Sequence, residues 1–328
     1  MKRFLASLFL VSLVAVPIRL SAQLLPVLGA QRAGTSSFQF LKIGAGARAA
    51  SMGGSFVAIA NDASALFWNP AGITQFSENE VIVGHASWFV DIRHQVLGAV
   101  YHLTPDDAVG LSVVSLHMDD MERTTETQPL GTGSYFTYAD LAVGVSYSRR
   151  LTQQFSFGAT VRYVEETLDV LKMNGVLVDL GTYYWTGLGT ARFSAVVTNF
   201  GSQIRPTGTA TLYGGSTISE FQEFSPPTMF RFGFAVEPYQ DESNSLTLSI
   251  QLNHPNDNSE NVSMGVEYAL MRTLFARAGY KLNVDEEQFS AGLGVEGLVG
   301  PVQLGMDYGF AAFSRLGAVH RISLLVKL

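Results

Sequence analysis

The sequence predicts a 14-stranded antiparallel transmembrane β-barrel, on three observations: high hydropathy without spanning helices, strict alternation, and connections that alternate in length. The chain has 328 residues, of which 47% are hydrophobic and 15% charged, and its mean hydropathy is +0.19. Beyond the N-terminal segment, no run of about 18 apolar residues is present that could form a spanning helix. A barrel resolves this contradiction, because its apolar residues are spread along strands that alternate between lipid and lumen.

Alternation with a period of two recurs along the chain. In residues 246–253, Leu or Ile occupies every even position and Thr, Ser, Gln or Asn occupies every odd position, which is the pattern of a strand with two different faces. Fourteen segments of this kind follow one another. We expect strands at residues 79–89, 93–104, 107–117, 134–150, 155–167, 174–187, 191–200, 226–238, 245–254, 261–271, 274–283, 288–297, 301–311 and 318–328.

The connections between these strands differ in length in a regular way. The two longest, residues 118–133 and 201–225, both follow odd-numbered strands, whereas most even-numbered strands are followed by tight turns such as residues 104–106. Bacterial barrels have an even number of strands, short periplasmic turns and longer outer loops. The sequence therefore predicts that both long connections lie on the outer side of the membrane, where we expect them to bind partners.

The less apolar face of the strands carries charge, as a barrel lumen would. A soluble β-sandwich, the remaining alternative, would place these charges in water. Tyrosines near the strand ends suit an interfacial aromatic girdle; they are Tyr147, Tyr163, Tyr183, Tyr268, Tyr280 and Tyr308. The charges expected to face the lumen are Asp140, Arg162, Arg192, Arg231, Glu237, Glu267, Arg277, Lys281, Glu296, Asp307 and Arg321.

The N-terminus has the pattern of a secretory signal peptide. Lys2 and Arg3 precede an apolar stretch that ends near Val16, and small residues lead up to Ala22. We expect cleavage after Ala22. A secreted chain that forms a membrane barrel is expected in the bacterial outer membrane, in contact with its lipid.

Residues 40–73 do not alternate; they read FLKIGAGARAASMGGSFVAIANDASALFWNPAGI and are rich in Gly, Ala and Ser. Small residues allow the close approach of two backbones that a segment threading a barrel lumen needs. The stretch resembles the N-terminal signature of the PorV/PorQ family of outer-membrane proteins, which are FadL-like barrels. The resemblance implies an internal hatch, or plug, at residues 23–78, followed by a barrel at residues 79–328.

Individual residues of this stretch match the family pattern. Asn69, Pro70 and Ala71 match the hatch element shared with the FadL-like barrels, and the resemblance implies that they set hatch conformation and gating. The residues alone also allow a simple turn before the first strand. We hypothesise that two charged members of the signature form ion pairs that seat the plug. The signature positions are Arg48, Gly53, Gly54 and Asp62.

The resemblance implies one of three functions. A type IX secretion-associated barrel would bind and shuttle secreted cargo at the cell surface. We expect its loops at residues 118–133 and 201–225 to bind either the secreted cargo proteins or subunits of the secretion machine. A FadL-like channel would instead take up long-chain fatty acids or other hydrophobic small molecules. A plugged barrel with a structural role is the third alternative.

Other functional classes find little support in the sequence. The chain has no Cys, its six His show no metal-ligand spacing, and no Gly-rich run is followed by the Lys-Ser/Thr of a phosphate-binding loop. The formal net charge of −7 argues against binding of nucleic acid through its phosphates. We therefore expect no enzyme activity, no cofactor and no metal site.

Overall fold

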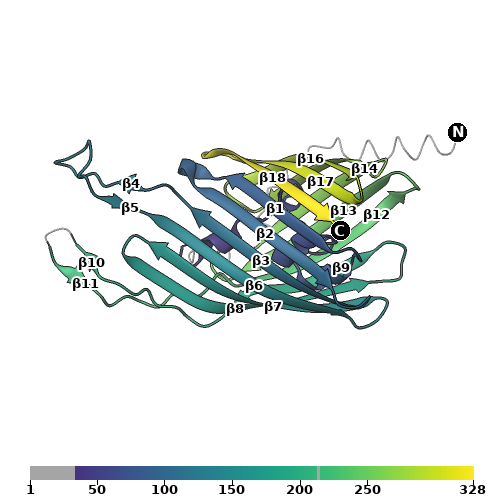
Figure 1. The fold of residues 1–328 in the computed structure, drawn as a ribbon, viewed down its shortest axis with the longest axis horizontal. Helices are drawn as coiled ribbons and strands as arrows, with labels where there is room; N and C mark the ends of the chain where they lie inside the picture. The colour runs from purple at the N-terminus through teal and green to yellow at the C-terminus, as the bar shows by residue number, and fades with distance from the viewer. Residues whose placement is uncertain (1–33, 213–214) are drawn as a thin grey trace.

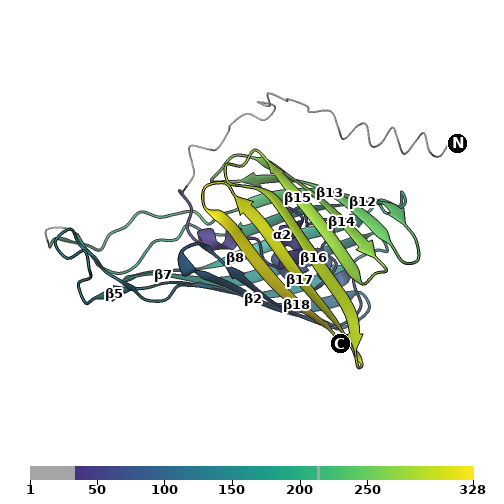
Figure 2. The same ribbon diagram turned by 90° about the horizontal axis from the view of Figure 1, so that it is seen from above.

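The computed structural model describes residues 34–212 and 215–328, and fourteen strands within these ranges form one closed antiparallel barrel (Figures 1 and 2). This confirms the predicted fold class and excludes the β-sandwich. The predicted signal peptide, residues 1–22, lies outside the described residues. The barrel strands are β1 (Glu80–Ser87), β2 (Arg93–His102), β3 (Asp107–His117), β6 (Tyr138–Arg150), β7 (Phe155–Leu168), β8 (Leu171–Trp185), β9 (Arg192–Phe200), β12 (Met229–Gln240), β13 (Ser245–Pro255), β14 (Asn261–Leu270), β15 (Leu274–Leu282), β16 (Glu287–Val299), β17 (Val302–Phe313) and β18 (Gly317–Lys327).

Each strand pairs with its sequence neighbours in the barrel, and the barrel closes between β1 and β18, where Glu80 lies opposite Lys327. We call the end with the short turns and Leu328 the turn end, and the opposite end the loop end. The two long connections lie at the loop end, as the sequence predicts. Each contains a short hairpin that projects beyond the barrel (Figure 1). These hairpins are β4 (Met121–Glu122) with β5 (Tyr135–Phe136), and β10 (Ala210–Thr211) with β11 (Thr217–Ile218).

The hairpin of β7 and β8 differs from the sequence prediction. A loop of several residues was expected between them, but β8 begins at Leu171 and only Asp169 and Val170 remain as a turn at the loop end. Asp169 adopts a left-handed backbone conformation with φ of 57°. Aspartate tolerates this conformation better than most residues, so the tight turn is feasible without glycine.

The barrel wall separates polar from apolar side chains as expected. The predicted lumen charges are all buried or half-buried, while Leu, Val, Phe and Tyr point outward. The prediction that Tyr183 belongs to the aromatic girdle is wrong. Tyr183 faces the lumen, is 1% exposed and donates a hydrogen bond to the Ala58 carbonyl. Side chains alternate between the two faces of a strand, so residues four positions apart in β8 lie on the same face. Asp179 is buried in the lumen, and Tyr183, four positions later, therefore faces the lumen as well.

Residues 34–79, which we call the hatch, lie largely inside the barrel and pack against its wall (Figure 2). Their backbone lies so close to the wall that a Cβ at Gly265 or Gly279 would collide with Met52 or Gly53. Among the described residues, no helix is long and apolar enough to cross a membrane. The short helices are η2 (Gln39–Lys42), α2 (Ala47–Ser51), η3 (Ala63–Phe67) and η4 (Pro70–Thr74) in the hatch, and η5 (Phe89–Asp91) between β1 and β2.

Candidate functional site

Arg48 on α2 connects the hatch to the barrel wall through two carboxylates. Its Nη1 lies 2.6 Å from Asp62 Oδ2 in the hatch, and its Nη2 and Nε each donate to Glu267 of β14 at 2.9 Å. The chain of charges continues along the wall: Arg277 Nε lies 2.5 Å from Glu267, and Arg277 Nη1 lies 2.5 Å from Asp307. Three carboxylates and two guanidinium groups therefore form one network inside the lumen.

Gly53 and Gly54 form the turn that follows α2. Both have positive φ, 65° and 71°, a region that glycine enters without steric cost. The Gly53 amide donates to Ser290 Oγ on β16 at 2.9 Å. The turn thus presses the hatch backbone against the wall at a place where neither side has room for a side chain.

The Asn69-Pro70-Ala71 motif fixes the part of the hatch nearest the turn end. Asn69 Oδ1 accepts a hydrogen bond from the Ala71 amide and so caps η4, while Pro70 occupies the first position of that helix. Asn69 Nδ2 donates to the carbonyls of Val57 in the hatch and Thr182 in β8. The motif therefore joins the hatch to the wall, in addition to forming a turn.

The beginning of the hatch is tied to the loops at the loop end. The Ser37 amide donates to the Ser225 carbonyl at 3.0 Å, and Lys42 Nζ lies 2.9 Å from Asp257 Oδ1 in the β13–β14 loop. Burial works against ionisation of Asp257, but hydrogen bonds from Gln39 and Lys42 hold the pKa of this carboxyl below its usual range. Its bonds therefore persist at neutral pH and are lost only as the pH falls through that lowered pKa.

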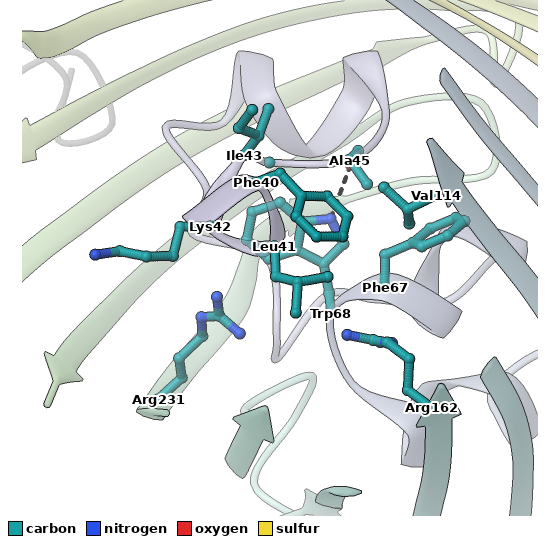
Figure 3. Close-up of a pocket in the computed structure, with 11 residues that line it drawn as sticks. Phe40, Leu41, Lys42, Ile43, Ala45, Phe67, Trp68, Val114, Arg162 and Arg231 are labelled. Carbon is teal, nitrogen blue, oxygen red and sulfur yellow. Dashed lines mark hydrogen bonds between the residues drawn. The ribbon is translucent and has the colours of Figure 1, made fainter. Parts of the chain in front are cut away.

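A small pocket of about 40 Å³ lies in the lumen between the hatch and three strands. Lys42 lines it together with the apolar residues Phe40, Leu41, Ile43, Phe67, Trp68 and Val114. Figure 3 shows Arg162 and Arg231 reaching into it from two different strands. Arg162 is paired with Asp179 at 2.7 Å. Arg231 has no carboxylate partner among the described residues; it donates to Thr198 Oγ1 and lies over the Trp68 ring.

The sequence identified most of these residues but not their partners. Arg48 and Asp62 meet, as hypothesised, yet Glu267 and Arg277 were expected only as general lumen charges. Asp257 and the pocket around Arg231 were not foreseen at all. Glycines on the inward face of the strands, such as Gly265 and Gly279, are a sequence signal that could have located the hatch seat, because glycine in a strand allows another backbone to approach.

We expect Arg48→Ala to loosen the hatch. The change leaves Asp62 buried without its cation, a loss that costs about 3–5 kcal/mol for buried pairs. Urea unfolding followed by tryptophan fluorescence, together with limited proteolysis of the hatch, measures the loss. The matched control is Arg149→Ala, because Arg149 pairs with Asp107 while 58% exposed. Unchanged unfolding and unchanged proteolysis of Arg48→Ala would show that the network does not seat the hatch.

Comparison with solved structures shows a shared fold at low sequence identity. The toluene transporter TbuX of Ralstonia pickettii superimposes with a TM-score of 0.57 at 13% identity, covering 87% of this chain and 97% of that chain. The toluene transporter TodX of Pseudomonas putida gives a TM-score of 0.56 at 15% identity, covering 80% and 92%. A Pseudomonas aeruginosa FadL homologue gives 0.56 at 13%, covering 83% and 95%. No curated protein sequence matches the chain.

The family is established by sequence. Residues 28–255, more than half of the chain, match the family described as type IX secretion system protein PorV. The match covers the hatch described above and the strands from β1 to β13. It includes all residues that line the pocket and both projecting hairpins. The chain therefore belongs to the PorV family and is an outer-membrane β-barrel of the type IX secretion system.

Proposed function

We propose that this barrel binds secreted cargo of the type IX secretion system at its loop end and holds it for transfer at the cell surface. The loop end then faces outward and the turn end faces the periplasm, after removal of a signal peptide near Ala22. The observation that carries the proposal is the pair of projecting hairpins, β4–β5 and β10–β11. Membership of a secretion-system family also supports a role without catalysis.

The two hairpins expose apolar side chains outside the barrel wall. Leu130 is 98% exposed and Tyr135 58%, and Leu212 and Ile218 of the second hairpin are also exposed. Each hairpin has only two strands, so their outer backbone edges are unpaired. Exposed apolar side chains beside free strand edges are features of surfaces that bind another chain.

The hatch is connected to the second of these two loops, which gives cargo binding a route to the lumen. Ser225, at the end of the connection that holds β10–β11, accepts the Ser37 amide. We propose that the Asn69-Pro70-Ala71 motif holds the far end of the hatch in place while this contact forms or opens. The hatch would then keep the lumen closed during cargo exchange.

A second candidate function is uptake of hydrophobic small molecules, and the pocket at Arg231 favours it. A buried guanidinium without a carboxylate partner suits an anionic head group. The pocket of about 40 Å³ has room for the head group, so an apolar tail would extend past the neighbouring aromatic and aliphatic side chains. Two of the solved structures that share this fold are described as toluene transporters, which makes passage of apolar compounds through such a barrel a reasonable candidate here. A plugged structural barrel would show neither activity.

The cargo proposal predicts that Leu130→Ser combined with Tyr135→Ser weakens binding of a purified C-terminal domain from secreted cargo. We expect a loss of about tenfold or more, since central apolar contacts at interfaces contribute about 1–2 kcal/mol or more each. Leu188→Ser is the matched control, because Leu188 is 79% exposed but lies at the turn end. Equal affinity of the double variant and the wild type for the cargo domain would count against the hairpins as the cargo site.

The transport candidate predicts that a long-chain fatty acid binds the purified barrel and that Arg231→Gln weakens this binding about tenfold or more, because it removes the charge that faces the carboxylate. Titration with a fluorescent fatty acid measures the affinity, and Arg149→Gln at the turn end is the control. If the wild type binds no fatty acid, or if Arg231→Gln binds it unchanged, the pocket has another role.

A further inference from the structure

Arg321 on β18 is buried without a hydrogen-bond partner among the described residues. Its side chain faces the lumen and is 3% exposed, and its Nε and Nη1 atoms donate to no other group there. A buried guanidinium that donates to nothing is costly, so this one calls for a partner. The other arginines that the sequence predicts in the lumen each donate at least one hydrogen bond; they are Arg162, Arg192, Arg231 and Arg277.

A second unpartnered side chain lies close to Arg321 on the same part of the wall. His94 of β2 is also 3% exposed, and its Nε2 is buried without a partner within residues 34–212 and 215–328. Strand register places the two near each other, because Ala86 on β1 lies opposite Arg321 on one side and opposite His94 on the other. The three strands are neighbours in the wall (Figure 1), and all three residues face the lumen. Alanine is small and leaves space between the two longer side chains.

A cavity of about 10 Å³ lies at this place, between the hatch and the wall. The hatch lines one side of it with Gly44, Gly46 and Ala47, and the wall lines the other with residues of β1, β2 and β18 that include Arg321 and His94. A cavity of this volume holds about one ligand of the size of a water molecule. Any ligand in it therefore touches both the hatch and the barrel.

The side chains that line the cavity offer hydrogen-bond donors and no carboxylate. Arg321 contributes the N–H groups of its Nε and Nη1, and the imidazole of His94 carries one N–H even when it is neutral. Ser323 Oγ accepts the Ala47 amide at 2.7 Å, and its own hydroxyl proton donates to no described residue. The lining is that of a site for an acceptor.

The charge around the cavity is not balanced within the described chain. The carboxylate that acts on Arg321 electrostatically is Glu287 of β16, but Glu287 is paired with Lys281 of β15. Two cations thus share one carboxylate. The Trp88 ring lies over the Arg321 guanidinium at 5.5 Å and covers one of its faces, while the N–H groups lie in the guanidinium plane and remain free to donate.

We propose that this cavity binds one monatomic anion, chloride or a related halide, which joins the hatch to the barrel wall. A halide supplies the missing negative charge and accepts several hydrogen bonds at once, and it is only slightly larger than a water molecule. A phosphate or a carboxylate-bearing molecule exceeds a volume of about 10 Å³. Water would accept the hydrogen bonds but would leave the charge of Arg321 unbalanced. The inference goes beyond the proposed function, because neither the projecting hairpins nor Arg231 takes part in this site.

Diffraction at long X-ray wavelength tests the site directly in crystals of the wild-type protein grown with sodium chloride, because chloride scatters anomalously there. We expect an anomalous difference peak between the Arg321 guanidinium and His94. The sulfur of Met52, in the same hatch, scatters almost as strongly and serves as the internal standard. Density without an anomalous signal at this position, as water gives, or chloride peaks only at other positions would overturn the proposal.

Trypsin cleavage of the hatch after Lys42 measures the effect of the anion in solution. At a chloride concentration about ten times that of half-saturation, we expect cleavage to be about tenfold slower than in gluconate of equal ionic strength, because the anion stabilises the seated hatch. Arg321→Gln should remove this dependence on chloride. Arg315→Gln should keep it, because Arg315 is 85% exposed in the turn between β17 and β18 and lies outside the cavity. Equal cleavage of the wild type in both salts, or a dependence that persists in Arg321→Gln, would show that the cavity holds no functional halide.

Discussion

The contact between the hatch backbone and the barrel wall is the constraint on which the structure depends. A barrel of fourteen strands encloses more space than its own inward side chains fill, and here residues 34–79 occupy that space. They fit because Gly265 and Gly279 leave room for Met52 and Gly53. Close packing of this kind leaves polar groups little access to water, and most of them have a partner inside the lumen. Ser55 Oγ and the Nε and Nη1 atoms of Arg321 are buried without a hydrogen-bond partner among the described residues.

The charge network follows from that constraint. Arg48 enters the lumen with the hatch and is stable there because Asp62 and Glu267 accept its hydrogen bonds, while Arg277 balances the second carboxylate. Nearer the turn end, the uncharged side chain of Asn69 also joins the hatch to the wall, because it donates hydrogen bonds to a hatch carbonyl and to a carbonyl of β8. Together with Lys42 and Asp257 at the loop end, these contacts hold the hatch along the whole length of the lumen.

Most of the fold could be predicted from the sequence because lipid and lumen impose opposite demands on alternate residues. This is why all fourteen strands were found and why the charges of the wall were placed correctly. Tyr183 was misplaced because tyrosine suits both an interface and a lumen, and only its phase relative to Asp179 distinguishes them. Partners such as Lys42 and Asp257 are far apart in sequence, and no local pattern connects them.

The central claim is that the hatch closes the lumen, and single-channel recording of the purified protein in planar lipid bilayers tests it most directly. If the hatch occupies the lumen as described, the barrel inserts without any steady ion conductance at neutral pH and moderate voltage. A stable open conductance from the intact wild-type chain under these conditions would contradict the account.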